Sequence, residues 1–344
     1  MKKEEIKNKN IFFNTNDVIK YDCLINMIYG ARGIGKTYGF IKYAIEHYEE
    51  TGKGTIYLRR YKDELREFES IINPLFENEN IKLNIEYKKN REFIDIDKDK
   101  NNVIIKGMPL SKAPITKSSN FNNYDIIIFD EFIIDKSNYQ YIPNEFIAFH
   151  NFVETVARMR EITNNTIIKT YMLANSASRN NPYFIGYNIP ITKKNPYIKN
   201  DLLLFKPSNE NFINEKLKTR WGQFIKNNTN MVDYMLYGDF NDKTDFIDKK
   251  LPQKNLYIAT LVYLKQKIGV IKDTKNNLIY ITDKINNTSK SIFSLTKEDD
   301  TPDIISINTN KKLLDAIKKY YNMGLLRFTD LKLQAIFIDI LKIL

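Results

Sequence analysis

Eight consecutive residues near the start of the chain have the types and spacing of a phosphate-binding loop: Gly30-Ala31-Arg32-Gly33-Ile34-Gly35-Lys36-Thr37. In such a loop the backbone N–H groups surround the phosphates of a nucleotide, and side chains at Gly30 or Gly35 would obstruct the curl of the backbone. Lys36 adds a positive charge and the Thr37 hydroxyl is a ligand for Mg²⁺. The loop lies between an apolar run, 24–29, and a stretch with helical spacing, whose N-terminus would face the phosphates. These residues predict a site for ATP and Mg²⁺, and the alternative is a chance glycine-rich turn.

Two adjacent carboxylates, Asp130 and Glu131, follow a second apolar run at 124–129. A buried parallel strand that ends in two acids is typical of a Walker B motif. Asp130 would belong to the Mg²⁺ shell, and Glu131 would orient and polarise the attacking water. An alternative is a carboxylate pair that caps the next helix. Together with the phosphate-binding loop, the pair predicts hydrolysis of ATP and not binding alone.

The composition limits the other kinds of chemistry. Cys23 is the single cysteine and there are two histidines, so we expect no internal disulfide, no cysteine-cluster metal site and no histidine-based zinc site. No apolar run reaches the roughly 18 residues of a membrane span, and the lysine-rich start lacks the apolar core of a signal peptide. These features predict a soluble intracellular protein in which Mg²⁺ is the only metal.

The chain is strongly basic, with a formal charge of +11 and a pI near 9.2. Clustered Lys and Arg bind polyanions by releasing condensed counterions, so the charge favours a nucleic-acid partner. The alternative is a lysine-rich solvated surface.

The first 205 residues alternate apolar runs with helical stretches, and this order predicts a doubly wound α/β sheet. We expect strands at 24–29, 55–58, 126–129, 167–173 and 202–205, and helices at 35–50, 63–76 and 144–160. Short strands at 81–87, 92–97 and 103–106 predict a β-rich insertion between the second and third of these strands.

The remainder of the 344 residues predicts two further parts. Residues 206–243 read as a linker subdomain whose packing points are Trp221, Phe224 and 235–237. Residues 244–344 predict a small α+β domain, with a strand meander at 256–264, 268–272, 278–282 and 291–295 and helices at 311–321 and 331–344. The last of these helices is too short to span a bilayer, so we expect it to pack in a core.

Several segments of the chain resemble one known family: 30–37, 58–65, 129–132, 141–145, 173–176 and 181–184. They are similar to the genome-packaging ATPase, or encapsidation protein, of small podoviruses of Gram-positive bacteria, a family related to the large terminases. The resemblance implies a P-loop ATPase of the ASCE class that forms a homomeric, pentameric ring on the portal of a bacteriophage capsid. Such a motor translocates double-stranded DNA into the preformed capsid and also contacts a prohead RNA. The resemblance places it in the host cytoplasm, transiently at the portal vertex, and not in the mature virion or in a membrane.

The same resemblance implies roles for further residues. Arg158 and Arg160, in the run Val156-Ala157-Arg158-Met159-Arg160, are the candidates for a finger that reaches the γ-phosphate of a neighbouring subunit, and Arg158 matches the family's finger position. An ordinary arginine at a helix C-terminus is the alternative. Lys62 matches a lysine that reaches the adjacent subunit's nucleotide. Asn175 fits a sensor that hydrogen-bonds the attacking water or the γ-phosphate, with helix capping as the alternative. Lys117 matches a DNA-binding lysine of the pore loop, with a solvated loop as the alternative.

The C-terminal part corresponds, on this resemblance, to the RNase-H-like nuclease of large terminases. Two-metal cleavage needs carboxylates on the central strands, whereas the predicted strand 256–264 has neither Asp nor Glu. Asp283 alone cannot hold two ions. We therefore expect a vestigial nuclease fold without nuclease activity. Two other functions remain as alternatives, a P-loop kinase of a small substrate and a non-hydrolysing nucleic-acid scaffold.

Overall fold

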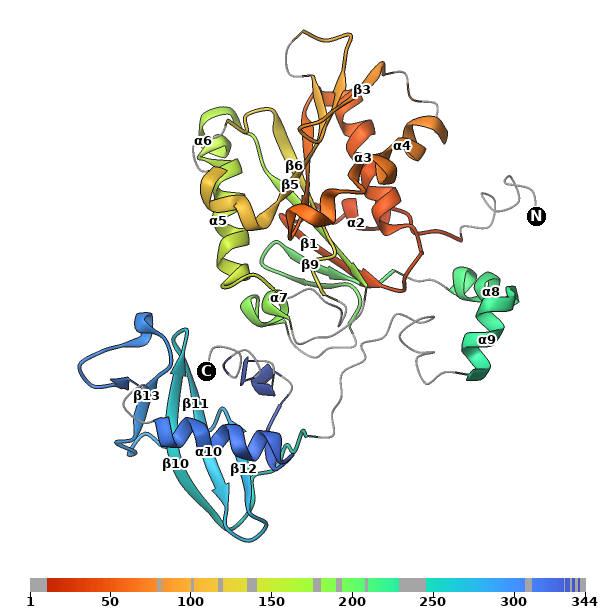
Figure 1. Cartoon of the computed structure of the whole chain (residues 1–344). Helices are drawn as coiled ribbons and strands as arrows, with labels where there is room; N and C mark the ends of the chain where they lie inside the picture. The colour runs from red at the N-terminus through yellow and green to blue at the C-terminus, as the bar shows by residue number, and fades with distance from the viewer. Residues whose placement is uncertain are drawn as a thin grey trace. The chain divides into compact units, whose positions relative to one another are not determined.

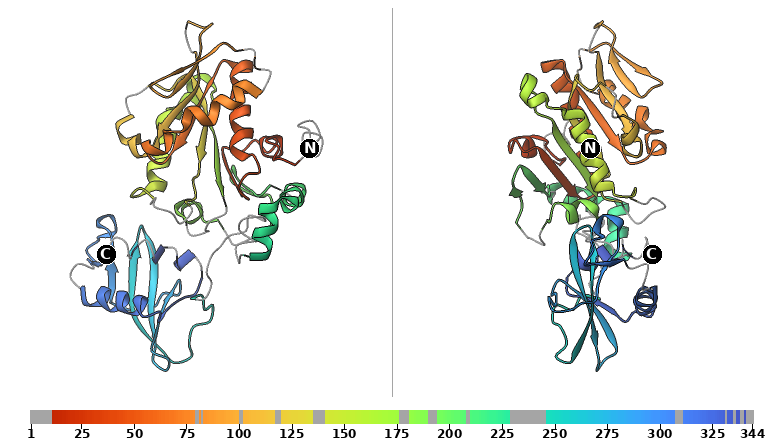
Figure 2. Two further views of the ribbon diagram at one scale, coloured as in Figure 1. Left: turned by 45° about the vertical axis from the view of Figure 1, so that its right-hand side comes forward. Right: turned by 90° about the vertical axis from the view of Figure 1, so that its left-hand side faces the viewer.

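The computed structural model describes residues 11–78, 81, 83–99, 102–116, 120–134, 141–175, 181–189, 194–207, 210–228, 246–306, 311–330, 332–334, 336–337 and 340. The chain divides into two compact units (Figures 1 and 2). Unit 1 comprises Met1–Ser178 and Pro190–Asn241, and unit 2 comprises Arg179–Ile189 and Asp242–Leu344.

Unit 1 is built on a mostly parallel sheet. Its described strands lie in the order β3 (Ile85–Lys88), β4 (Glu92–Asp95), β5 (Val103–Pro109), β2 (Gly54–Arg59), β6 (Tyr124–Asp130), β7 (Lys169–Asn175), β1 (Ile25–Gly30), β9 (Leu202–Phe205) and β8 (Tyr197–Lys199). The strands from β5 to β9 are parallel, and β3, β4 and β8 extend the sheet antiparallel at its two ends. The predicted doubly wound sheet is thus confirmed. The prediction that 103–106 belongs to the insertion is wrong, because β5 pairs in parallel with β2 inside the sheet.

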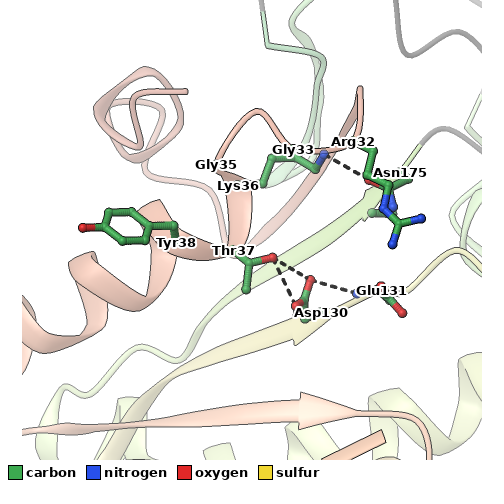
Figure 3. Close-up of a pocket in the computed structure, with 10 residues that line it drawn as sticks. Arg32, Gly33, Gly35, Lys36, Thr37, Tyr38, Asp130, Glu131 and Asn175 are labelled. Carbon is green, nitrogen blue, oxygen red and sulfur yellow. Dashed lines mark hydrogen bonds between the residues drawn. The ribbon is translucent and has the colours of Figure 1, made fainter. Parts of the chain in front are cut away.

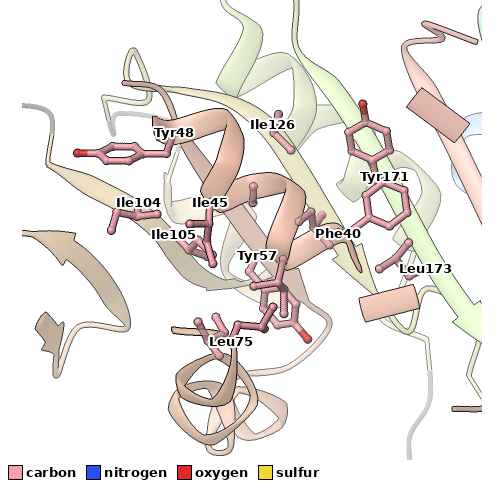
Figure 4. Packing of buried hydrophobic residues seen from close by; sticks show 14 of the residues in the cluster. Phe40, Ile45, Tyr48, Tyr57, Leu75, Ile104, Ile105, Ile126, Tyr171 and Leu173 are labelled. Carbon is pink, nitrogen blue, oxygen red and sulfur yellow. The ribbon is translucent and has the colours of Figure 1, made fainter. Parts of the chain in front are cut away.

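Helices cover both faces of this sheet. On one face α3 (Lys36–Thr51) and α4 (Phe68–Asn78) pack on the strands, with Phe40, Ile45 and Tyr48 of α3 buried as their spacing predicts (Figure 4). On the other face Phe149 of α5 (Glu145–Ala157) stacks on Phe129 of β6 with ring centroids 5.6 Å apart. Strand β6 supplies Ile126 and Ile128 to the first face and Phe129 to the second, the alternation that a strand buried on both sides requires.

The predicted helix at 144–160 is two helices. It breaks after α5 at Arg158 and Met159, which both have positive φ, and α6 (Arg160–Asn164) follows. The predicted helix at 63–76 likewise begins as a short 3-10 turn, η1 (Lys62–Leu65), before α4. A further 3-10 segment, η2 (Leu110–Thr116), lies beside α5, and a short helix, α2 (Asn16–Ile19), precedes β1.

The predicted linker region contains two helices that belong to unit 1, α8 (Glu210–Lys218) and α9 (Arg220–Asn228). Ile213 and Ile225 are their buried apolar residues. Trp221 and Phe224 are instead 61% and 50% exposed, so the prediction that they are packing points is wrong.

Unit 2 contains a second sheet and a short helix, α7 (Pro182–Gly186), whose Ile185 packs on its core. The described strands lie in the order β14 (Ile305–Ser306), β13 (Ile292–Ser294), β10 (Asn255–Tyr263), β11 (Gln266–Asp273), β12 (Leu278–Thr282) and β15 (Leu326–Phe328). The meander prediction holds for β10 to β12, but β13 crosses over and pairs in parallel with β10. Strands β13 and β14 continue the sheet in parallel beyond β10, and β15 pairs in parallel with β12 at the other edge.

Two apolar helical stretches complete the core of unit 2. Helix α10 (Lys311–Asn322) buries Leu314 and Ile317, and a 3-10 turn, η4 (Lys297–Asp299), links β13 to β14. In the last stretch, residues 332–334, 336–337 and 340 are helical, and Leu333, Phe337 and Ile340 are buried in the same core. The prediction of a packed helix is confirmed at these positions. Within the described residues, no helix has the length and apolar character of a membrane span.

Candidate nucleotide-binding and hydrolysis site

The phosphate-binding loop connects β1 to α3 at the carboxyl edge of the parallel sheet. Gly33 and Gly35 have φ values of 86° and 89°, a left-handed conformation that favours glycine. Ala31 and Ile34 point into the core, so they contribute only backbone groups to the site. Gly30 has an ordinary φ, and a Cβ there would meet Pro207 at 3.5 Å, an ordinary contact. The expectation that a side chain at Gly30 would obstruct the loop is therefore wrong, and the loop depends instead on Gly33 and Gly35.

Lys36 crosses the inside of this loop. Its Nζ donates to the backbone oxygens of Ala31 at 2.8 Å and Gly30 at 3.3 Å. It also donates to Oδ1 of Asn175 at 3.5 Å (Figure 3). Burial lowers the pKa of Lys36 to about 8, although Asp130 acts in the opposite direction. A buried ammonium group held by neutral oxygens is well placed to receive the oxygens of a phosphate.

Thr37 and Asp130 meet as the metal-site prediction requires. Thr37 Oγ1 donates to both carboxylate oxygens of Asp130, at 3.1 and 3.2 Å (Figure 3). The hydroxyl of Tyr57 on β2 donates to Asp130 Oδ2 at 2.6 Å. Burial, reinforced by Asp130, raises the pKa of Tyr57 well above 10, so this residue stays a hydrogen-bond donor. A threonine hydroxyl beside one carboxylate provides the hard oxygen ligands that Mg²⁺ prefers, and the nucleotide and water supply the others.

Glu131 is held by Arg59, which lies in the family-like segment 58–65 but had no predicted role. Arg59, the last residue of β2, donates to Glu131 Oε2 at 2.7 Å and lies 3.5 Å from Asp130 Oδ2. It also contacts Glu64 Oε1 at 3.4 Å. Burial alone would lower the pKa of Arg59, but Asp130, Tyr57 and the two glutamates raise it. Arg59 therefore keeps its charge and fixes the orientation of the predicted catalytic carboxylate.

A second arginine, Arg60, holds the backbone of the turn that carries Glu131. Glu131 itself has a positive φ of 58°. The fully buried Arg60 makes a two-pronged ion pair with Glu145 at 2.7 and 2.8 Å and donates to the backbone oxygens of Glu131 and Phe132. This pair ties β2, the Walker B turn and the start of α5 together, so the left-handed backbone at Glu131 is held by the fold.

These residues line one open cavity of about 290 Å³, formed by Arg32, Gly33, Gly35, Lys36, Thr37, Tyr38, Asp130, Glu131, Ala174 and Asn175. Its volume is near the lower end of the range for ligand pockets. Within the described residues no cluster of three His, Cys, Asp or Glu side chains could hold a metal alone. Thr37 and Asp130 therefore fit a metal ion whose other ligands come from a bound polyphosphate and water.

The other predicted site residues lie in different places. Asn175 ends β7, which separates β1 from β6, so it is beside the P-loop strand and the Walker B strand but not beside β2. Lys62 is exposed at the start of η1 and is not among the lining residues of the cavity. Arg158 is exposed at the C-terminal end of α5. Lys117 lies outside the described residues.

The two arginines of the Val156–Arg160 run have different environments, because Arg158 is exposed and Arg160 is buried. Arg160 is buried and donates to the backbone oxygens of Phe121, Tyr124 and Asn122 at 2.5 to 3.2 Å. It joins α6 to the loop before β6 and has no access to a nucleotide. Only Arg158 of the two remains suitable for an intermolecular contact.

The pKa of Lys36 gives a testable pH dependence. Phosphates favour the charged lysine, so nucleotide binding should raise this pKa and take up a proton at a pH above about 8. Affinity should be constant below about 8 and fall by up to tenfold per pH unit above it. Calorimetric titration near pH 9 in two buffers of different ionisation enthalpy measures the uptake. Lys36→Met should show weaker binding and no uptake, and an absence of uptake in the unmodified chain would contradict the prediction.

Comparison with known proteins gives one consistent result. The family model "Podovirus DNA encapsidation protein (Gp16)" matches residues 7–343. The DNA packaging protein of Bacillus phage phi29 is 32% identical over 317 residues, which cover 92% of this chain and 90% of that protein. That of Bacillus phage B103 is 32% identical over 331 residues, or 94% and 98% of the two chains.

Solved structures agree with this result. A chain of the bacteriophage Phi-29 viral genome packaging motor assembly has a TM-score of 0.72 and 29% identity, covering 97% of this chain and 99% of that chain. The Phi-28 gp11 DNA packaging motor has the same fold, with a TM-score of 0.68 and 20% identity over 94% and 95% of the chains.

Proposed function

The chain belongs to the podovirus DNA encapsidation protein (Gp16) family, and from this membership we propose that it hydrolyses ATP to drive double-stranded DNA into a preformed capsid. As a member of the family it is a bacteriophage DNA packaging protein. One observation carries the proposal for hydrolysis: Lys36, Thr37, Asp130 and Glu131 line a single cavity at the carboxyl edge of the sheet. A small-molecule kinase or a non-hydrolysing scaffold would not need a carboxylate held at the position of Glu131.

Each residue of the cavity then has a role. The backbone N–H groups of residues 30–37 and the Lys36 ammonium would bind the phosphates, and Thr37 and Asp130 would hold Mg²⁺. When bound there, the metal would supply positive charge to neutralise the phosphate oxygens. Glu131 orients and polarises a water for attack on the γ-phosphate, and Arg59 fixes the carboxylate through its 2.7 Å contact. Asn175, 3.5 Å from Lys36 Nζ, is within reach of the same phosphate.

The remaining assignments concern other molecules. We propose a homomeric ring, consistent with the similarity of this chain to a component of the phi29 motor assembly, in which Arg158 and Lys62 of one subunit approach the nucleotide of the next. The ring would act at the capsid portal, in the host cytoplasm, beside a prohead RNA. Five copies and absence from the mature virion are parts of the same proposal.

DNA would be gripped through its backbone. Lys117 and the basic C-terminal part, with 17 Lys and Arg against 11 Asp and Glu over residues 245–344, supply the positive charge. We expect no nuclease activity, because β10 carries no acid where two-metal cleavage would need one. The proposed division is an ATPase part at 1–205, a linker at 206–243 and a nucleic-acid-binding part at 244–344.

The function is tested by its response to DNA and salt. Steady-state ATP hydrolysis should require Mg²⁺ and rise with added duplex DNA of any sequence. The DNA concentration for half-maximal stimulation should increase by about 10²-fold or more between roughly 50 and 200 mM salt, because counterion release drives the contact. Hydrolysis without DNA serves as the control and should change little. Stimulation that is equal at both salt concentrations would contradict a backbone grip.

A further inference from the structure

Helix α9 presents a pair of stacked aromatic rings at the surface of unit 1. Trp221 and Phe224 are 61% and 50% exposed, and their ring centroids are 5.4 Å apart at an interplanar angle of 13°. They occupy one face of the helix, while Ile225 faces the protein. Tryptophan is among the residues that contribute most to protein interfaces when it enters a pocket.

A pocket of matching chemistry lies elsewhere on unit 1. It has a volume of about 190 Å³, and its lining is mainly apolar: Ala113, Pro143, Asn144, Ile147, Ala148, Asn151 and Thr155. Most of these residues come from one stripe of α5, and Ile147 at its rim is 48% exposed. A pocket of this size can admit an aromatic side chain.

The aromatic pair cannot fill this pocket within one molecule. In Figures 1 and 2, α9 and α5 lie on opposite sides of the sheet of unit 1. With the aromatic pair on one side and the α5 pocket on the other, two copies would meet head to tail. Repeated head-to-tail contacts form a ring when the rotations between successive subunits add up to a full turn.

The position of Arg158 connects this contact to the nucleotide. Ile147, Asn151, Thr155 and Arg158 follow one another on α5 at helical spacing, so the arginine ends the stripe that lines the pocket. Arg158 lies 11 residues beyond Ile147, or ~16 Å along the helix.

The helix before the aromatic pair reaches the phosphate-binding loop of its own chain. A Cβ on Gly33 would lie 3.7 Å from the ring of Phe212 on α8, and Phe12 lies 3.6 Å from a Cβ on Gly35. Trp221 lies on the next helix, α9, which begins just after α8 ends and packs against it. The aromatic pair therefore follows directly on the helix that touches the phosphate-binding loop, and the pocket lies on the helix that Arg158 ends.

We propose that the Trp221–Phe224 pair of one subunit docks into the α5 pocket of a second copy of this chain, and that this docking positions the second copy's Arg158 at the first copy's nucleotide. The inference deepens the proposed function by naming the surfaces that bring the finger into place. The exposed rim charges suit the contact, because Arg220 and Lys226 flank the aromatic pair and Glu154 lies on the exposed side of α5. Trp221 and Phe224 act here as positioning residues.

Cross-linking between two populations tests the docking without relying on hydrolysis. Full-length Asn227→Cys chains, which keep both aromatic residues and change an exposed position one turn after Phe224, are mixed with Asn151→Cys chains, a non-hydrolysable ATP analogue and a short bismaleimide. The mixture should give a dimer of twice the 40.6 kDa chain mass in several-fold greater yield than either population alone. The unmodified chain is the background control, because its single cysteine, Cys23, is buried. A yield no greater than that of Leu256→Cys with Asn151→Cys would overturn the proposal.

A second measurement uses the double variant Trp221→Ala Phe224→Ala. We expect self-association at least ~30-fold weaker, as for a central interface residue, with unchanged nucleotide binding and thermal unfolding. Trp221→Phe should retain most of the association, and Leu256→Ala, which changes an exposed residue of unit 2, should retain all of it. Unchanged self-association of the double variant, or a loss confined to nucleic-acid binding, would overturn the proposal. If the cross-link forms but the unmodified chain hydrolyses no ATP, the proposed function fails and the docking stands.

Discussion

Glu131→Gln should lower the rate of ATP hydrolysis by about 10³-fold while ATP still binds with nearly its normal affinity. The amide keeps the shape of the side chain and a contact with Arg59, but it cannot polarise water, and a positioned general base typically contributes 10² to 10⁴ in rate. Single-turnover hydrolysis measures the chemical step, and fluorescent-nucleotide titration measures binding.

Glu161→Gln is the matched control, because Glu161 is an exposed carboxylate on α6 outside the cavity. It should hydrolyse ATP at the normal rate. A Glu131→Gln chain that retained more than about a tenth of the activity would remove Glu131 from the mechanism. A parallel loss of binding would instead indicate that the substitution had disturbed the loop or the metal ligands.

Arg158→Ala should reduce hydrolysis by about 10³-fold in the assembled state and have little effect on nucleotide binding by a single chain. Arginine fingers contribute 10³ to 10⁵ in comparable enzymes, because they stabilise charge on the transferring phosphoryl group. Arg158 is outside the lining of its own chain's cavity, so the proposed finger would act between subunits. Arg66→Ala, which removes an exposed arginine paired with Asp63, should behave as the unmodified chain.

Mixing the two inactive variants tests that arrangement directly. Arg158→Ala chains have an intact cavity, and Glu131→Gln chains have an intact finger, so a mixed ring contains neighbours that together make a complete site. Hydrolysis should reappear in part, with a maximum at intermediate ratios. No rescue at any ratio would exclude a finger that acts between chains.

The linear order of residues was enough for those parts of the site that are contiguous in the chain. The run Gly30–Thr37 takes its loop geometry from glycines that tolerate positive φ, followed by a helix whose N-terminus meets the anion, and both are local properties. The apolar run before Asp130 likewise indicated a buried strand that ends in two acids. These local features, with the charge and the single cysteine, were sufficient to predict the fold class and the nucleotide chemistry.

Contacts between distant residues depended on how the strands assemble. Arg59 and Glu131 are 72 residues apart in sequence, and they meet only because β2 pairs with β6 in the register that sets Leu58 beside Phe129. The sequence does not distinguish the roles of Arg59, Arg60 and Arg160. In the structure Arg59 orients the Glu131 carboxylate, Arg60 is buried in an ion pair with Glu145, and Arg160 donates to the backbone at the start of β6.

Trp221 and Phe224 read as core residues by type, and only the folded chain leaves them exposed. The backbone conformation of a short segment depends mainly on the residues within that segment. Strand order, register and burial depend on the packing free energy of the whole chain. The native arrangement forms because it has a lower free energy than the other ways of pairing distant segments.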